Sequence, residues 1–164
     1  MYFPFTASKY ILTAAHCADG VFKHEVVIGA HEIRDPSNKI INAYSPTVHP
    51  EWDSYNLAND LAILELEEEI DFDEYGGNVR PNCLASSGDF TGELALVSGW
   101  GRPSDSASGI SPVLRYVDNR RVLSQSECEN YWGNLNEGVV CIDTTGGKGS
   151  CNVSSLKRFL KAQK

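Results

Sequence analysis

The sequence contains no uninterrupted apolar run of about 18 residues, the length that a helix needs to cross a bilayer. Basic residues are also scarce, since 14 Lys and Arg stand against 22 Asp and Glu and give a formal net charge of −8. Nucleic-acid-binding proteins neutralise phosphates with clustered Lys and Arg. We therefore expect no membrane span and no nucleic-acid partner. The basic segment 157–164 has too few apolar residues to predict a membrane-surface helix.

Signals for metal binding and for secretion are missing as well. The histidines at positions 24, 31 and 49 do not have metal-ligand spacing, and the acidic segment 65–74 lacks the Asp-x-Asp-x-Asp-Gly pattern of a calcium loop. A charge run of this kind is usually a solvated face. We expect no metal and no cofactor. Residues 1–5 lack the basic and apolar regions of a signal peptide.

The composition is that of a soluble globular domain, with 41% hydrophobic and 22% charged residues in 164 positions. This length is sufficient for one domain with a hydrophobic core. The five cysteines are an odd number, so at least one thiol lies outside any intramolecular disulfide.

Short apolar runs bounded by turn residues predict a mainly β structure. A Ser124-x-x-Glu127 capping box predicts a short helix toward Trp132. Gly, Pro and Ser in residues 76–92 indicate a linker. The predicted strands include residues 10–12, 26–28, 39–41, 46–50, 61–66, 94–101, 113–117 and 139–142.

Three motifs carry the chemical interpretation. Thr13-Ala14-Ala15-His16-Cys17 follows an apolar strand, and a histidine there is most often structural. Asn59-Asp60-Leu61-Ala62-Ile63-Leu64 supplies a carboxylate before an apolar strand, and Ser98-Gly99-Trp100-Gly101 follows later. In this order and spacing the three motifs resemble the chymotrypsin/trypsin-like serine proteases. Residues 114–118 and 149–152 look like those of arthropod chymotrypsin-like digestive enzymes.

The resemblance implies an all-β fold, the trypsin-like double β-barrel, in an incomplete form. We expect a single domain fragment, with a first barrel at about 1–75, a linker at about 76–92 and a partial second barrel at about 93–152. Residues 153–164 read as an unrelated tail, and the first strands and the end of the second barrel are expected to be missing. The resemblance also implies a disulfide between Cys128 and Cys141.

The resemblance assigns roles to four residues. His16 is the general base of a Ser-His-Asp triad, and Asp60 is the buried residue that orients it. Ser155 occupies the nucleophile position by count alone. Gly149 stands where trypsin-like members carry the aspartate that binds Lys or Arg, which implies chymotrypsin-like specificity.

The nucleophile segment departs from the family pattern Cys-x-Gly-Asp-Ser-Gly-Gly. It reads Cys151-Asn152-Val153-Ser154-Ser155-Leu156. Val153 replaces the glycine whose N–H forms half of the oxyanion hole, and Ser154 replaces the aspartate that pairs with the activated N-terminus. We therefore expect this chain to lack protease activity.

Three functions follow from these motifs. The first is a monomeric, extracellular serine endopeptidase by descent, acting on protein or peptide substrates where it is active. The second is a non-catalytic homologue that serves as a binding or regulatory module. The third is a fragment without function.

Overall fold

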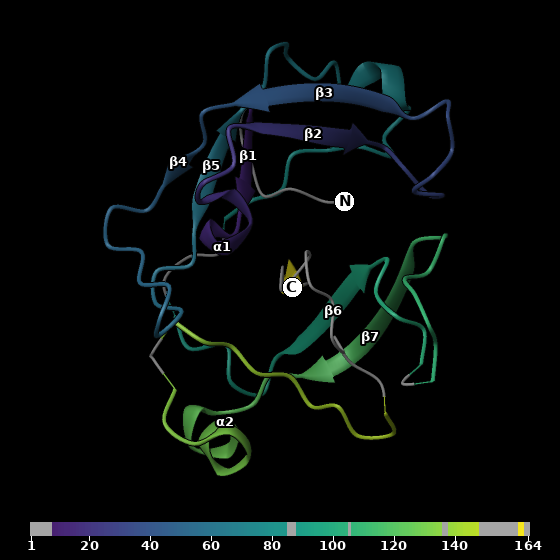
Figure 1. The fold of residues 1–164 in the computed structure, drawn as a ribbon. Coiled ribbons are helices and arrows are strands. Elements are labelled where there is room, and N and C mark those ends of the chain that lie inside the picture. Colours follow the sequence, from purple (N-terminus) through teal and green to yellow (C-terminus); the bar gives the residue numbers. More distant parts are fainter. Residues whose placement is uncertain (1–7, 85–87, 105, 136–137, 148–160, 163–164) are drawn as a thin grey trace. The chain divides into compact units, whose positions relative to one another are not determined.

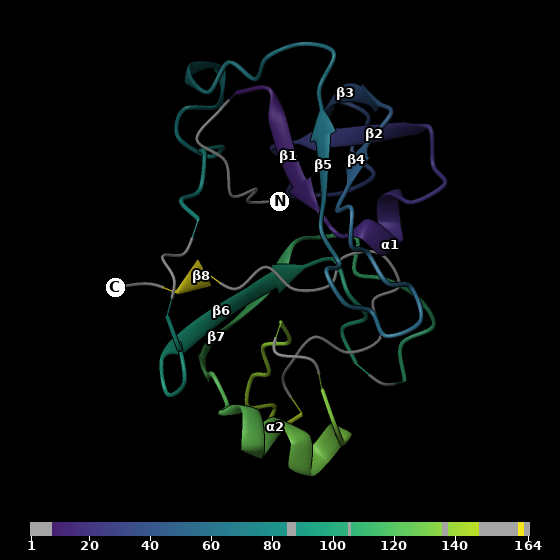
Figure 2. The same cartoon turned by 90° about the vertical axis from the view of Figure 1, so that its left-hand side faces the viewer.

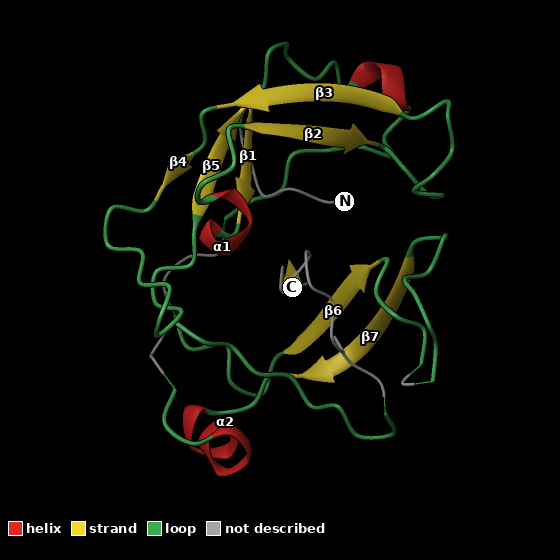
Figure 3. Ribbon diagram, in the orientation of Figure 1, coloured by secondary structure: helices red, strands yellow, loops and turns green. Residues whose placement is uncertain are grey.

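The computed structural model describes residues 8–84, 88–104, 106–135, 138–147 and 161–162 (Figure 1). The chain divides into two compact units, Met1–Leu84 and Ala85–Lys164. Strands outnumber helices in the described residues, and the longest helix there has eight residues (Figure 3). Within the same residues, no helix has the length and apolar character to cross a bilayer.

The first unit contains two small antiparallel sheets. One has the strand order β1-β5-β4, formed by Tyr10–Thr13, Ala62–Glu65 and Thr47–Val48 (Figure 2). The other pairs β2 (Lys23–Ile28) with β3 (Lys39–Tyr44), which lie side by side in Figure 1. The strands predicted from the apolar runs in this unit are therefore present, with shifted ends.

A contiguous apolar core lies in the first unit. Alternate residues of β5 point inward, since Ala62 and Leu64 are buried while Ile63 and Glu65 are exposed. This alternation is what a strand with one covered face requires. Phe72, Tyr75 and Val79 pack against the core from the segment after β5. The core cluster comprises Ile11, Val26, Ile28, Ile41, Ala43, Leu64, Leu66 and Ile70.

The acidic side chains of residues 65–74, which begin at the last residue of β5, are exposed and make ion pairs. Lys9 contacts Glu65 at 3.1 Å, and Lys39 contacts Glu68 and Glu74 at 3.6 Å each. The segment continues into a single 3₁₀ turn, η1 (Asp73–Tyr75). Among the described residues, no group of three or more His, Cys, Asp and Glu side chains is arranged to hold a metal ion.

The second unit is built on one antiparallel sheet and one helix. The strand order is β7-β6-β8, formed by Arg115–Arg121, Leu94–Gly99 and Lys161–Ala162. A register shift between Ala95 and Val97 interrupts the pairing of β6 with β7. β8 belongs to the segment interpreted as an unrelated tail, yet it pairs with β6.

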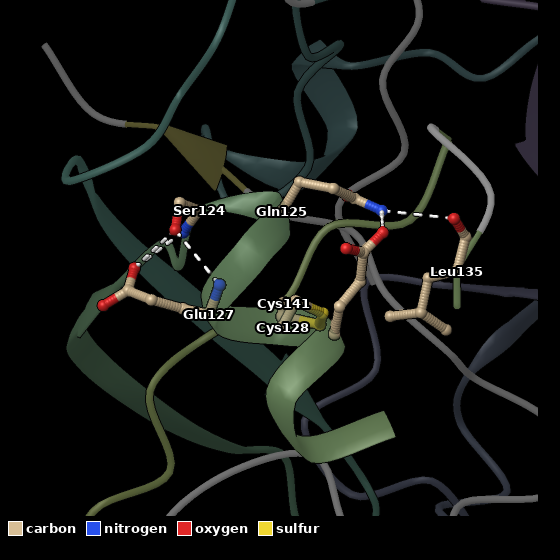
Figure 4. The surroundings of a disulfide bond; sticks show 7 residues. Ser124, Gln125, Glu127, Cys128, Leu135 and Cys141 are labelled. Carbon is tan, nitrogen blue, oxygen red and sulfur yellow. Dashed lines mark hydrogen bonds between the residues drawn. A yellow bond between two sulfur atoms is a disulfide. The ribbon is translucent and has the colours of Figure 1, made fainter. Parts of the chain in front are cut away.

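The helix α2 (Gln125–Trp132) begins with the predicted capping box (Figure 4). The Glu127 N–H donates to the Ser124 hydroxyl at 3.2 Å, and the Ser124 N–H donates to the Glu127 carboxylate at 2.9 Å. A disulfide joins Cys128 in the helix to Cys141, with the Cα atoms 5.9 Å apart. The disulfide implied by the family resemblance is therefore present.

Two strand predictions in this unit were wrong in detail. β7 begins at Arg115 instead of Val113, because Ser111 holds the preceding loop by bonding to Trp100 and to the Val113 carbonyl. The run at residues 139–142 forms only an isolated bridge, between Ile142 and Val122. Two flanking hydrogen bonds hold that bridge, and the Asp143 carboxylate then accepts from the Thr145 N–H and starts a turn.

Candidate catalytic site

The pairing of β1 with β5 brings His16 and Asp60 together. Thr13 ends β1 and lies opposite Ala62, the first residue of β5. Because the strands are antiparallel, the end of β1 and the start of β5 meet at one edge of the sheet. His16 follows Thr13 in the short helix α1 (Ala15–Ala18), and Asp60 precedes Ala62. The register of β1 and β5 thus brings together two residues that lie 44 positions apart in the sequence.

Both oxygens of the Asp60 carboxylate contact His16. The imidazole Nδ1 lies 2.7 Å from Oδ2, and the backbone N–H of His16 donates to Oδ1 at 2.9 Å. An ionised carboxylate can only accept hydrogen bonds, so Nδ1 carries the proton in this contact. The other ring nitrogen, Nε2, then has a lone pair when the imidazole is neutral. This arrangement makes His16 able to take up a proton at Nε2.

The structure corrects one expectation for this pair. Asp60 was predicted to be buried, but its side chain retains 28% exposure and that of His16 retains 26%. The reason is local, since Asp60 lies in the turn that precedes β5 and not within the strand. The carboxylate is therefore held by directed hydrogen bonds while part of it remains exposed.

A tight turn presents the Asp60 side chain. Asn59 has the left-handed φ of 54°, which asparagine tolerates better than most residues. The Leu61 N–H donates to the Asn59 carbonyl at 2.7 Å, so the backbone closes around Asp60. The Asn59 side-chain amide donates to the Glu51 carbonyl at 2.8 Å and ties the turn to the preceding loop. No motif in the sequence marks this role of Asn59.

The other predicted site residues cannot be placed beside this pair. Gly149 and Ser155 lie outside the residues that the structure describes, as does the whole segment 148–160. The structure therefore brings together two of the four residues with predicted roles. The Trp52 indole N–H also donates to the Asp19 carboxylate, and no motif in the sequence marks either residue.

Comparison with known proteins gives the family. The trypsin family model matches residues 5–155. The chain belongs to the trypsin family. Its relatives include brachyurin from Leptuca pugilator, 40% identical over 149 residues, and chymotrypsin from Phaedon cochleariae, 31% identical over 150 residues. Each alignment covers 90% of this chain, but only 64% and 54% of the respective relative.

A solved structure supports the same assignment. The chain superposes on neuropsin, described as a serine protease expressed in the limbic system of mouse brain, with a TM-score of 0.78 at 25% identity. The match covers 91% of this chain and 66% of neuropsin. The predicted fold class, an all-β trypsin-like fold, is confirmed, and the family is one of serine endopeptidases. The chain spans less than two thirds of the lengths of these proteins.

Proposed function

We propose that the chain derives from a secreted serine endopeptidase in which His16 is the general base and Asp60 orients it. The observation that supports this most is the double contact of the Asp60 carboxylate, one oxygen on the ring Nδ1 and the other on the His16 backbone. A carboxylate at Nδ1 fixes the tautomer that leaves Nε2 basic, and it stabilises the imidazolium once Nε2 is protonated. His16 would then accept the proton of a nucleophilic hydroxyl.

The proposal extends to the substrate and the organisation of the domain. Proteins or peptides are the substrate class of the family, and Gly149 in place of an aspartate favours chymotrypsin-like cleavage. Extracellular function suits the Cys128–Cys141 disulfide, which persists in an oxidising compartment. We place the first barrel at about 1–75, the linker at about 76–92 and the second barrel at about 93–152, and we expect a monomer.

We also propose that the chain as it stands has no triad-dependent activity. Loss of one oxyanion donor costs roughly 10²–10³ in rate. Val153 occupies the glycine position of that donor and resists the backbone angles that glycine adopts. Ser154 lacks the charge that would pair with an activated N-terminus, and Leu156 replaces the glycine after the nucleophile. The members of a triad act as a unit, so a base and its orienter alone give little rate enhancement.

A fluorophosphonate probe, which labels activated serines, tests both parts. We expect no labelling of the chain itself, and labelling that disappears in Ser155→Ala would overturn the proposed inactivity. A chimera carrying the Gly-Asp-Ser-Gly-Gly segment and the flanking N- and C-terminal segments of a chymotrypsin-like relative should be labelled. That labelling should fall strongly in His16→Ala and in Asp60→Asn. A labelled chimera that ignores both substitutions would refute the roles of His16 and Asp60.

A second function is favoured by the altered nucleophile segment, which occurs in a chain whose His16–Asp60 contact is intact. A non-catalytic homologue would bind protein or peptide partners without cleaving them. Binding of peptides with a large apolar residue, measured on the unlabelled chain by calorimetry without product formation, would support this function. The third alternative, a fragment that does not fold, predicts no cooperative melting transition by circular dichroism.

A further inference from the structure

The helix that carries His16 is too short to be stable by itself. α1 has four residues, whereas isolated helices shorter than about 12 residues are marginal in water. Its N-cap residue, Ala14, makes no side-chain capping hydrogen bond. The orientation of the His16 ring must therefore depend on contacts that the helix makes with the rest of the first unit.

One such contact lies at the other end of the helix. Asp19 is the C-cap residue of α1, and its carboxylate accepts a hydrogen bond from the Trp52 indole N–H at 3.2 Å. Trp52 lies in the loop that leads from β4 to Asp60, and it is partly buried. An indole N–H can only donate and an ionised carboxylate can only accept, so Trp52 is the donor and Asp19 the acceptor. Hydrogen bonds to a charged acceptor are stronger than those between neutral groups.

The contacts form a closed circuit between the helix and the loop. His16 bonds to Asp60, Asn59 bonds to the Glu51 carbonyl, and Trp52 bonds back to Asp19 on the same helix as His16. The backbone links Asn59 to Asp60 and Glu51 to Trp52 directly. The backbone N–H of Trp52 also donates to the His49 carbonyl at 3.0 Å, which fixes the start of the loop. The two segments that carry the pair are thus joined at two separate points.

We propose that Asp19 and Trp52 are positioning residues that hold the His16 helix in register with the Asp60 turn. The inference rests on the proposed function of His16 and Asp60. Ala15 and Ala18 pack α1 against the first unit, and the two hydrogen bonds of His16 hold it at one further point, the Asp60 carboxylate. The Trp52–Asp19 bond lies one helical turn further on and adds a second directed contact that limits rotation of α1 about the His16–Asp60 contact.

The test is amide hydrogen exchange of the full-length chain, monitored by NMR. The reporter is the His16 backbone N–H, which donates a hydrogen bond to the Asp60 carboxylate. Trp52→Phe keeps an aromatic ring and removes the indole donor, and Asp19→Ala removes the acceptor. Losing a hydrogen bond of ordinary strength should speed His16 exchange about threefold to tenfold in each. Asp19→Asn retains an acceptor oxygen and should remain within about twofold of the parent.

Controls separate this proposal from a general loss of stability and from the proposed function. Asn42→Ala removes an equally exposed hydrogen bond, to Glu67 at 2.9 Å, and should leave His16 exchange unchanged. Amides of the β2–β3 pair should keep their parent rates in the Trp52 and Asp19 variants, and equal acceleration everywhere would overturn the positioning role. Protection that is lost in Asp60→Ala but unaffected in Trp52→Phe and Asp19→Ala overturns this inference alone. A His16 amide unprotected in the parent would overturn both proposals.

Discussion

The two units of this chain are stabilised in different ways. The first contains eight buried apolar side chains in one cluster, drawn from β1, β2, β3, β5 and the segment after β5. The described part of the second unit buries few large side chains, with Trp100 and Val122 the main apolar ones. Its helix is instead fixed by a disulfide, a capping box and an ion pair between Arg121 and Glu127.

The difference has its origin in the strand sequences. β5 alternates small or branched apolar residues inward, whereas β7 reads Arg-Tyr-Val-Asp-Asn-Arg-Arg and is mostly exposed. Tyr116 in β7 retains 70% exposure. A hydrophobic cluster stabilises through the apolar area it removes from water, while capping and covalent contacts act locally at the points they join. The stability of the first unit should therefore depend mainly on the volume of its buried side chains. The stability of the second unit should depend mainly on its disulfide, its helix cap and its ion pair.

The largest expected effect is the truncation of a core side chain in the first unit. Leu66 is 1% exposed, and Leu66→Ala should lower the free energy of unfolding by about 2–5 kcal/mol through lost burial and a cavity. Hydrogen exchange of the β2–β3 amides should accelerate accordingly, while the β6–β7 amides keep their rates. Ile63→Ala, at a 39% exposed position in the adjacent strand β5, is the matched control and should have a much smaller effect. Equal acceleration in both units would contradict a separate core.

Removal of the disulfide should reverse that pattern. The double variant Cys128→Ala/Cys141→Ala opens a loop with a sequence separation of 13, which the chain-entropy account values at about 3 kcal/mol. Exchange of the α2 amides should accelerate most, and that of the β2–β3 amides should not change. Cys83→Ala, at an exposed cysteine, should leave both sets as they are. A destabilised first unit would show that the units depend on each other.

The sequence predicted those features that a local pattern determines. A short apolar run located β5, and the Ser124-x-x-Glu127 pattern located the start of α2. The motif containing Asp60 and the motif containing His16 predicted a contact that the register of β1 and β5 accounts for. In each case the signal is contained in a few neighbouring residues.

Features that depend on distant partners were not predictable in this way. The β-branched run at residues 139–142 has strand character, but no local pattern shows that it forms only one bridge. Burial of Asp60 was inferred from the apolar strand that follows it, and the turn in fact leaves it partly exposed. The bond from Trp52 to Asp19 requires the path of a whole loop, so neither residue could be recognised from its neighbours.

A smaller effect is expected from the helix cap. Ser124→Ala removes the acceptor of the Glu127 N–H and should destabilise the second unit by about 1 kcal/mol, within a range of about 0.5–2. Ser124→Thr retains the hydroxyl and should lose much less. Thermal melting followed at α2 by NMR measures both variants. If Ser124→Ala melted at the parent temperature, the Ser124 cap would not contribute to the stability of the second unit.

The smallest expected effect is the pH response of the Glu127 ion pair. Hydrogen bonds from Arg121, and then from the backbone and hydroxyl of Ser124, lower the pKa of Glu127 from 4.5 to about 2. A pKa lowered by folding means that the unfolded chain takes up the proton first, so the stabilisation is full above about pH 4.5 and declines from there toward pH 2. The pair is exposed, so the effect is modest and should weaken in salt.

Carboxyl NMR titration of Glu127 measures this directly. The midpoint should lie near pH 2 in the parent and rise toward 4.5 in Arg121→Met, which keeps an unbranched apolar stem but removes the charge and the donors. The melting temperature of the parent should also approach that of Glu127→Gln as the pH falls from about 5 to about 2, and the two should differ most at neutral pH. A midpoint unchanged by Arg121→Met would mean that the Ser124 cap alone holds the carboxylate. The stability of α2 would then depend on the Cys128–Cys141 disulfide and the Ser124 cap, without a contribution from the ion pair. The second unit would differ more clearly from the first, which is stabilised by a buried apolar cluster.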